Sequence, residues 1–304
     1  MSKFSIKDLE HLSGIKAHTI RIWEQRYELL HPERTDTNIR YYGDQDLKLV
    51  LNVALLKDHG HKISKIANMS LQDMQEEVVR ITQTNLGFED QIHALTLCTV
   101  EMDEAGFDKL LSTSIVKMGF EKTVINVIFP FLRQVGILWQ TGAIIPAQEH
   151  FISNLIRQKL IIAIENQHVH PERNAKKYIL YLPEGELHEL SLLFTDYVVR
   201  SRNNKSIYLG QGLPLPDLES AYEIYKPDYL FTVITCFPSS TDVQTYVNQI
   251  AARFPDVTII LTGMQIVGQA IDIPSNVVVM NSVPDMISFV ESNSEPAGSQ
   301  IFLN

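Results

Sequence analysis

The sequence of 304 residues predicts a multidomain α and α/β fold, with two helical parts followed by one doubly wound α/β part. Three observations predict this. Residues 4–70 combine two short amphipathic helices with a short strand-like segment, and residues 71–170 carry apolar side chains at almost uninterrupted helical spacing. From Lys176 onward, short β-rich apolar runs alternate with helix-length amphipathic stretches, as in a parallel sheet covered by helices on both faces. With 45% hydrophobic residues, the chain has enough apolar side chains for several cores.

The first part predicts a helix-turn-helix motif followed by a basic wing. Residues 4–12 have apolar side chains at helical spacing, Ser13-Gly14 supplies a turn, and residues 18–27 form a second amphipathic helix. Ile20 and Trp23 are expected to face the first helix, which leaves the start of the second helix to meet base edges. The expected domain is a winged helix-turn-helix DNA-binding domain over residues 1–72.

The candidate DNA contacts fall into two groups. Side chains at the start of the second helix are expected to reach base edges, and those at its end and on the wing to bind phosphates. The candidates are His18, Thr19 and Arg21 at the start, Arg26 and Tyr27 at the end, Arg34 and Arg40 on the wing, and Tyr41 and Tyr42, which divide between wing packing and backbone contact. Residues 1–70 carry a net charge of +2 within a chain of −10, so the excess of acidic residues lies outside the expected DNA-binding part.

The two cysteines and the apolar runs indicate the compartment. Cys98 and Cys236 lie far apart in apolar segments, so two buried free thiols are expected rather than a disulfide or a metal pair. No apolar run reaches the ~18 residues that a membrane span needs, and the sequence starts without an apolar signal core. These features predict a cytoplasmic protein with no membrane partner.

The middle part predicts a four-helix bundle over residues 73–172. Weak breaks separate four helical stretches, and short loops between helices favour antiparallel neighbours. The breaks are at 85–87, Asp103, 118–119 and 141–142.

The last part predicts a five-stranded parallel Rossmann-like domain over residues 173–292. The expected strands are 178–182, 206–209, 229–234, 257–261 and 277–280. Gly210-Gln211-Gly212 lacks the spacing of a dinucleotide-binding motif and is expected to be the turn after the second strand. The polar residues 293–304 are expected to form a flexible tail.

The residues of the first part closely resemble the winged helix-turn-helix domain of the MerR family of transcription regulators. This resemblance rests on the order Arg21, Trp23-Glu24, Arg26-Tyr27, Pro32, Arg34 and Arg40-Tyr41-Tyr42.

Two further motifs resemble those of cobalamin-binding proteins. Glu186 and His188 follow the first expected strand, as the acid and the histidine do in cobalamin-binding Rossmann-like domains. Trp139, nine residues and then Glu149-His150 resemble the helical cap domains that cover the upper face of the corrin ring. With the MerR-like part in front, residues 4–290 are similar to the cobalamin-dependent photoreceptor regulators of the CarH and LitR type.

The resemblance implies a set of cobalamin-binding residues. His188 would be the metal ligand, to the cobalt of cobalamin, and Glu186 would accept the other ring N–H and raise the basicity of the ligand. Trp139, Glu149 and His150 would cover the upper face. The nucleotide tail would meet Ser191 in place of the family's glycine, Thr232 and Thr235 in the third strand segment, and Thr262 and Gly263 in place of paired glycines.

The resemblance implies a regulator and no enzyme activity. Its effector would be a cobalamin, either adenosylcobalamin with a light response or another form. Its partners would be double-stranded operator DNA, further copies of the chain in a homo-oligomer, and RNA polymerase.

Two alternatives remain open. The departures Gln140, Ser191 and Thr262 favour the same regulator with a degenerate pocket that binds another small molecule or none. The other alternative is a corrinoid carrier protein of a methyltransferase system, which leaves the wing residues without a role.

Overall fold

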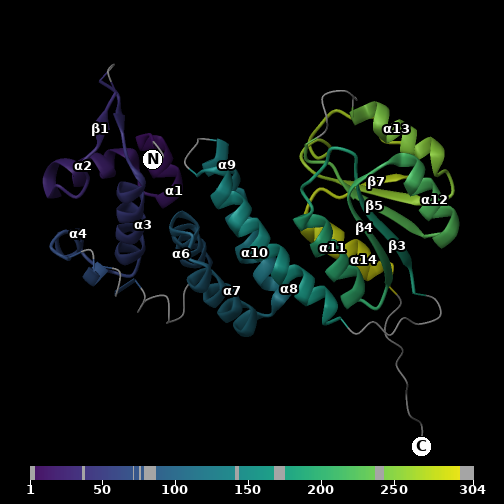
Figure 1. Ribbon diagram of the computed structural model, residues 1–304, viewed down its shortest axis with the longest axis horizontal. Helices are drawn as coiled ribbons and strands as arrows, with labels where there is room; N and C mark the ends of the chain where they lie inside the picture. Colours follow the sequence, from purple (N-terminus) through teal and green to yellow (C-terminus); the bar gives the residue numbers. More distant parts are fainter. Residues whose placement is uncertain are drawn as a thin grey trace, which may run out of the picture. The chain divides into compact units, whose positions relative to one another are not determined.

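The computed structural model describes residues 4–35, 38–70, 72–74, 77–78, 87–140, 144–167, 175–236 and 243–294. The chain divides into two compact units, Met1–Ile156 and Arg157–Asn304, and the division falls within the sequence of one long helix (Figure 1). The boundary expected at 172–173 lies outside the described residues, as does 295–304 of the expected tail.

The first unit begins with the predicted helix-turn-helix and wing. Helix α1 (Ile6–Ser13) starts with a capping box, in which Asp8 N donates to Ser5 Oγ and Ser5 N to Asp8 Oδ2. The turn at Gly14 adopts a left-handed conformation (φ 69°), and α2 (Ala17–Tyr27) follows. Strands β1 (Glu33–Arg34) and β2 (Arg40–Tyr41) pair antiparallel as the wing, before α3 (Asp44–Asp58) and α4 (Ile63–Ile66).

The helical part of the first unit has two of the breaks that the sequence predicts, at Asp103 and at 118–119, whereas 85–86 and 141–142 lie outside the described residues. Helix α6 (Phe88–Glu101) ends where Asp103 caps α7 (Glu104–Met118), and α7 ends at Gly119. A third helical stretch runs without interruption through α8 (Phe120–Thr123), the π-helical turn η1 (Val124–Ile128) and α9 (Phe129–Gln140). Helix α10 (Pro146–Glu165) completes the series and continues into the second unit.

The second unit is the predicted doubly wound α/β domain. Its parallel strands have the order β4-β3-β5-β6-β7, so the chain winds outward in both directions from β3. The strands are β3 (Lys177–Pro183), β4 (Lys205–Leu213), β5 (Tyr229–Val233), β6 (Thr258–Thr262) and β7 (Val277–Val279). The helices are α11 (Leu190–Ser201), α12 (Leu215–Tyr225), α13 (Val243–Arg253) and α14 (Val283–Ser292).

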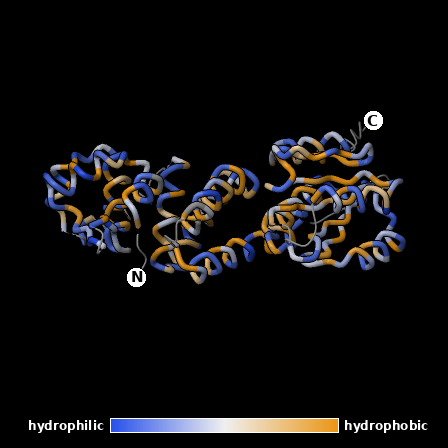
Figure 2. Tube along the Cα trace, turned by 90° about the horizontal axis from the view of Figure 1, so that it is seen from above, coloured by the Kyte–Doolittle hydropathy of each residue, from blue (hydrophilic) through white to orange (hydrophobic). Residues whose placement is uncertain are grey.

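The core of the second unit lies between the sheet and its helices. Figure 2 shows hydrophobic runs along the strands. Side chains of β3, β5 and β6 pack against α12 and α13, including Ile179, Leu230, Ile259, Leu218 and Val247, all fully buried. Buried strands of this kind need apolar residues at successive positions, which explains the continuous apolar runs in the sequence.

Two predictions about this unit are wrong. Gly210-Gln211-Gly212 lies inside β4 rather than in a turn, because register shifts against β3 let the strand continue through positive φ angles at both glycines. Cys236 is exposed rather than buried, since it lies in the loop beyond the carboxyl end of β5, whereas Cys98 is a buried free thiol as predicted.

In the part of the chain that the structure describes, each helix is either too short or too polar to cross a membrane.

Gly263, directly after β6, requires glycine for two reasons. Its φ angle is 111°, and an added Cβ would lie 2.3 Å from the carbonyl oxygen of Ile234. We therefore expect Gly263→Ala to lower the free energy of unfolding of the second unit by ~3 kcal/mol or more.

Gly268→Ala is the matched control for this change. Gly268 also has a positive φ (76°), but nothing lies within 4 Å of an added Cβ, so a loss of only about 1–2 kcal/mol is expected. Urea denaturation of both variants measures the difference. Equal losses would show that the backbone angle alone, and not the contact with Ile234, requires glycine.

Candidate functional site

The exposed face of α2 carries several of the predicted DNA-binding side chains. Ile20 and Trp23 are buried, so helical periodicity turns His18, Arg21 and Arg26 toward solvent. Thr19 is only partly exposed and lies 3.3 Å from the His18 ring. The sequence analysis missed Gln25, which is exposed four residues after Arg21 and therefore shares its face.

The wing positions a second group of polar side chains. Arg34 is exposed, and its guanidinium donates to Asn38 Oδ1 at 2.7 Å across the hairpin. Tyr41 is partly exposed, and its hydroxyl donates to Glu33 of the facing strand. Arg26 lies over the ring of Tyr27, 5.6 Å from its centroid. These cations lie on or near the exposed side of the helix-turn-helix and wing.

Glu24 joins the wing to α2, a role that the sequence analysis missed. Its carboxylate accepts hydrogen bonds from Arg40 Nε at 3.2 Å and from the Tyr42 hydroxyl at 3.1 Å, and its side chain is 14% exposed. The backbones of Tyr42 and Phe4 also form two hydrogen bonds of 2.9 Å. The wing therefore has a fixed position relative to α2.

The expected DNA contact of Tyr42 is not possible in this structure. Tyr42 is fully buried, and burial together with the nearby Glu24 carboxylate raises the pKa of its hydroxyl to about 12. Of the two roles expected for the wing tyrosines, Tyr42 has the packing role. Arg40 is half-buried beside Glu24, so the Glu24 carboxylate neutralises part of its charge.

In the second unit, Glu186 organises the loop after β3. Its side chain is fully buried, and it accepts five hydrogen bonds. Oε1 accepts from Leu187 N, His188 N and His188 Nδ1, and Oε2 accepts from Thr235 N and Cys236 N. Burial alone would raise the pKa of this carboxyl, but the hydrogen bonds from His188 and the two loops lower it to about 2.

This arrangement fixes the orientation of His188. Its Nδ1 lies 2.6 Å from Glu186 Oε1, and the side chain is 58% exposed. The geometry of imidazole then directs Nε2 away from Glu186. A histidine whose second ring nitrogen is bound to a carboxylate is the usual form of a metal-ligating histidine.

The other residues predicted for the cobalamin tail are only partly brought together. Thr235 approaches Glu186 through its backbone N–H, and Thr232 at the end of β5 is buried with a hydroxyl that has no hydrogen-bond partner among the described residues. Thr262 donates its hydroxyl to Met280 O at 2.8 Å. Ser191 lies in the first turn of α11, and Gly263 packs against Ile234.

In the first unit, the predicted cap residues lie on either side of the α9–α10 connection. Trp139 is near the end of α9 and is 56% exposed. Glu149 and His150 lie in α10, with His150 Nδ1 2.8 Å from Glu149 Oε2, and Ser153 donates to the other carboxylate oxygen. Trp139 and Ile145, which lie before and at the end of this connection, are both exposed apolar side chains.

Comparison with known proteins identifies two domain families. Residues 4–72 match the MerR HTH family of regulatory proteins, and residues 91–163 match a B12 binding domain family. The chain is 26% identical over 258 residues to the HTH-type transcriptional repressor CarH of Myxococcus xanthus, covering 83% of this chain and 85% of that protein. It is 27% identical over 228 residues to the repressor CarA of the same organism, covering 73% of each.

A solved structure shares the fold. The monomethylamine corrinoid protein of Methanosarcina barkeri superposes with a TM-score of 0.50 at 13% identity, over 68% of this chain and 100% of that chain.

The two exposed arginines, one on α2 and one on the wing, allow base and phosphate contacts to be separated. We expect Arg34→Ala to weaken binding to all duplexes and to reduce the slope of log affinity against log salt by about one. We expect Arg21→Ala to relax the preference at one base pair, by about 1–3 kcal/mol. Affinities for duplexes selected from a random pool, measured at several salt concentrations, test both.

Arg253→Ala is the control for the loss of one positive charge, since Arg253 is exposed on α13 and pairs with Glu219. A sequence-dependent loss from Arg34→Ala would show that the two roles are reversed.

The buried Glu186 carboxylate predicts a local dependence on pH. Its pKa in the folded chain lies below the ordinary 4.5, so its stabilising effect is present above about pH 4.5 and is lost as the pH falls toward about 2. We expect Glu186→Gln to expose the two loops at neutral pH, with ~10-fold faster amide exchange at residues 187–188 and 235–236.

Hydrogen–deuterium exchange of the full chain measures this effect. Glu184→Gln, at an exposed position in the same loop, is the matched control and should change nothing. Unchanged exchange in Glu186→Gln would contradict the role of the carboxylate.

Proposed function

We propose that this chain is a transcription regulator similar to the MerR and CarH type, which binds operator DNA through α2 and the wing and responds to a cobalamin. The DNA-binding residues of this proposal are His18, Thr19, Arg21, Arg26, Tyr27, Arg34, Arg40 and Tyr41. A MerR-type domain gives these residues a function that a corrinoid carrier protein would not use.

The hydrogen bond between His188 Nδ1 and Glu186 is the observation that most directly supports cobalamin binding. It holds the imidazole in one tautomer and orientation, so that Nε2 is the nitrogen offered to a metal. The ionised carboxylate, whose pKa is lowered to about 2, increases the basicity of the ring.

Two further observations bear on the fit of the cobalamin tail. The buried Thr232 hydroxyl, which has no partner in the described part of the chain, would gain one from a nitrogen of the tail's benzimidazole. An unsatisfied buried hydroxyl costs about 1–3 kcal/mol, so such a contact favours binding. The Thr262 hydroxyl donates to Met280 O, so it can meet the tail only as an acceptor.

The first unit would contribute the residues that meet the upper face of the corrin. The exposed Trp139 indole provides a flat apolar surface, and Glu149 and His150 provide polar groups beside the start of α10. A bound adenosylcobalamin would supply a cobalt–carbon bond that light can break, which is the chemistry of a light-dependent response. A change in oligomeric state would then decide whether two DNA-binding domains span two half-sites, and RNA polymerase would be the partner at the promoter.

A second candidate function is favoured by the Thr262–Met280 hydrogen bond. Thr262 and Ser191 occupy positions where the family has glycines, and both carry side chains where the tail would lie. The same regulator would then bind another small molecule or none.

Visible absorption spectra distinguish the two candidates. The full chain is incubated with adenosylcobalamin in the dark, separated from free corrinoid by gel filtration, and measured before and after illumination. We expect the wild-type protein to retain the corrinoid and His188→Ala to bind it at least ~10-fold more weakly, because the lower ligand is lost.

His31→Ala, at an exposed position in the first unit, is the control and should behave as the wild type. Failure of the wild-type protein to retain corrinoid, or spectra that His188→Ala leaves unaltered, would support the second candidate. DNA binding measured on the same dark and illuminated samples tests the light response.

A further inference from the structure

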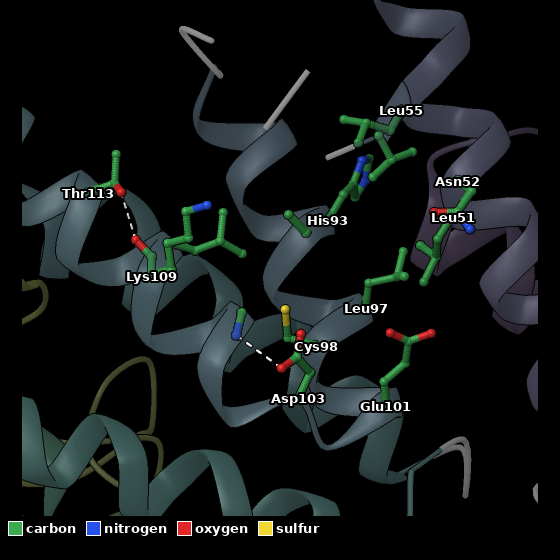
Figure 3. Close-up of a pocket in the computed structure, with 14 residues that line it drawn as sticks. Leu51, Asn52, Leu55, His93, Leu97, Cys98, Glu101, Asp103, Lys109 and Thr113 are labelled. Atoms are coloured by element: carbon green, nitrogen blue, oxygen red, sulfur yellow. Dashed lines mark hydrogen bonds between the residues drawn. The ribbon is translucent and has the colours of Figure 1, made fainter. Parts of the chain in front are cut away.

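A cavity of about 540 Å³ lies where the DNA-binding part of the first unit contacts its helical part. It is lined from α3 by Leu51, Asn52 and Leu55, and from α6 and α7 mainly by leucine, alanine and a few polar side chains. Figure 3 shows His93 and Leu97 of α6 together with Asn52 and Leu55 of α3 around it. This volume is in the range of small-molecule sites, which are concave and largely apolar.

Two buried polar atoms in the cavity wall have no hydrogen-bond partner among the described residues. They are Oδ1 of Asn52, a residue that is only 4% exposed, and Nδ1 of His93. Leaving such an atom unsatisfied costs about 1–3 kcal/mol, and native structures contain few of them. Both atoms belong to residues that line one cavity.

The charge of the wall favours an uncharged ligand. Burial lowers the pKa of His93, even though Asp58, Asp90 and Glu89 act in the opposite direction, so the ring is neutral at pH 7. A neutral imidazole offers one N–H and one lone pair. Of the acidic groups that line the cavity, Glu101 is paired with Lys48 at 3.2 Å and Asp103 caps α7. Lys109 also lines the cavity, so these acidic and basic side chains balance in charge.

The required polar group can be deduced from these two side chains. Asn52 Oδ1 only accepts, so the ligand must donate to it, and His93 Nδ1 takes either role according to its tautomer. A primary amide both donates and accepts, which suits the pair, and the surrounding leucines suit an aromatic or aliphatic body.

The elements that form the cavity connect the DNA-binding part with the bundle. Helix α3 packs against α1 of the helix-turn-helix, and it is joined to α6 by the pairs Lys48–Glu101 and His59–Asp90. Gln134 Nε2 of α9 also donates to Leu12 O of α1 at 3.0 Å. A molecule in the cavity therefore contacts both parts of the first unit at once.

We propose that this cavity is a second effector site, which binds an uncharged small molecule with an apolar body and a primary amide or similar donor–acceptor group at Asn52 and His93. Binding there links α3 to α6 and α7, and so favours one arrangement of the DNA-binding part on the bundle. All of the residues that form this site belong to the first unit and are separate from Glu186 and His188.

Naphthamide and its N,N-dimethyl derivative, which cannot donate a hydrogen bond, are suitable probes. Saturation-transfer NMR of the full chain is expected to show saturable binding of naphthamide at millimolar concentration and at least ~10-fold weaker binding of the dimethyl derivative. Asn52→Leu should reduce naphthamide affinity by about tenfold, because the acceptor is lost.

A stability measurement separates this site from a packing defect. Replacing the unsatisfied Asn52 amide by an apolar side chain of similar size should raise Tm by roughly 2–4 °C while binding is lost. His93→Leu should likewise weaken naphthamide binding. Asn248→Leu, at an exposed position on α13, is the control and should change neither quantity.

The possible outcomes each decide the question. Weaker binding together with a higher Tm in Asn52→Leu supports the site. The absence of naphthamide binding, equal binding of the dimethyl derivative, or a lower Tm in Asn52→Leu overturns it. Since His188→Ala leaves this cavity intact, a failure here is independent of the cobalamin test.

Discussion

The five hydrogen bonds of Glu186 are the interaction on which the candidate ligand site of the second unit depends. A carboxylate removed from water is stable only when its oxygens are fully hydrogen-bonded, and here the donors come from the loop after β3 and the loop after β5. The same bonds set the orientation of His188. The position of the two loops, the ionisation of Glu186 and the direction of the His188 ring therefore all depend on the same hydrogen bonds.

Glu24 has a comparable role in the first unit. It is largely buried, and it connects α2 to the wing through Arg40 and to the core through Tyr42. Because the wing consists of two very short strands, this carboxylate supplies the order that strand pairing alone would not. The exposed Arg21 and Arg34 then lie on surfaces of fixed relative position, which is what recognition of a duplex requires.

The contact between the DNA-binding part and the bundle is polar at its edges and partly empty inside. The Lys48–Glu101 ion pair, the close approach of His59 to Asp90 and a side-chain hydrogen bond join the two parts. The cavity beside Asn52 and His93 occupies space that a tightly packed core would fill. The leucines of α3 at this contact are buried, but the cavity leaves part of their surface without a packing partner. The contact is therefore a place where a small molecule, or a change elsewhere in the bundle, can alter how the DNA-binding part is held.

The sequence by itself determined the local structure and the identity of most of the predicted site. Helical spacing around Ile20 and Trp23, the turn at Gly14 and the apolar runs of the strands are short-range patterns. A helix buried on one face has apolar residues at helical spacing, and a strand buried on both faces has a continuous apolar run. The pairing of Glu186 with His188 was also predictable, since the two residues lie in one loop. Tertiary structure decided the rest: the burial of Tyr42, the exposure of Cys236, the continuation of β4 through Gly210 and the role of Glu24. Each of these depends on residues distant in the sequence that meet only in the folded chain, as do Asn52 and His93 in the cavity wall, and no local pattern records such contacts.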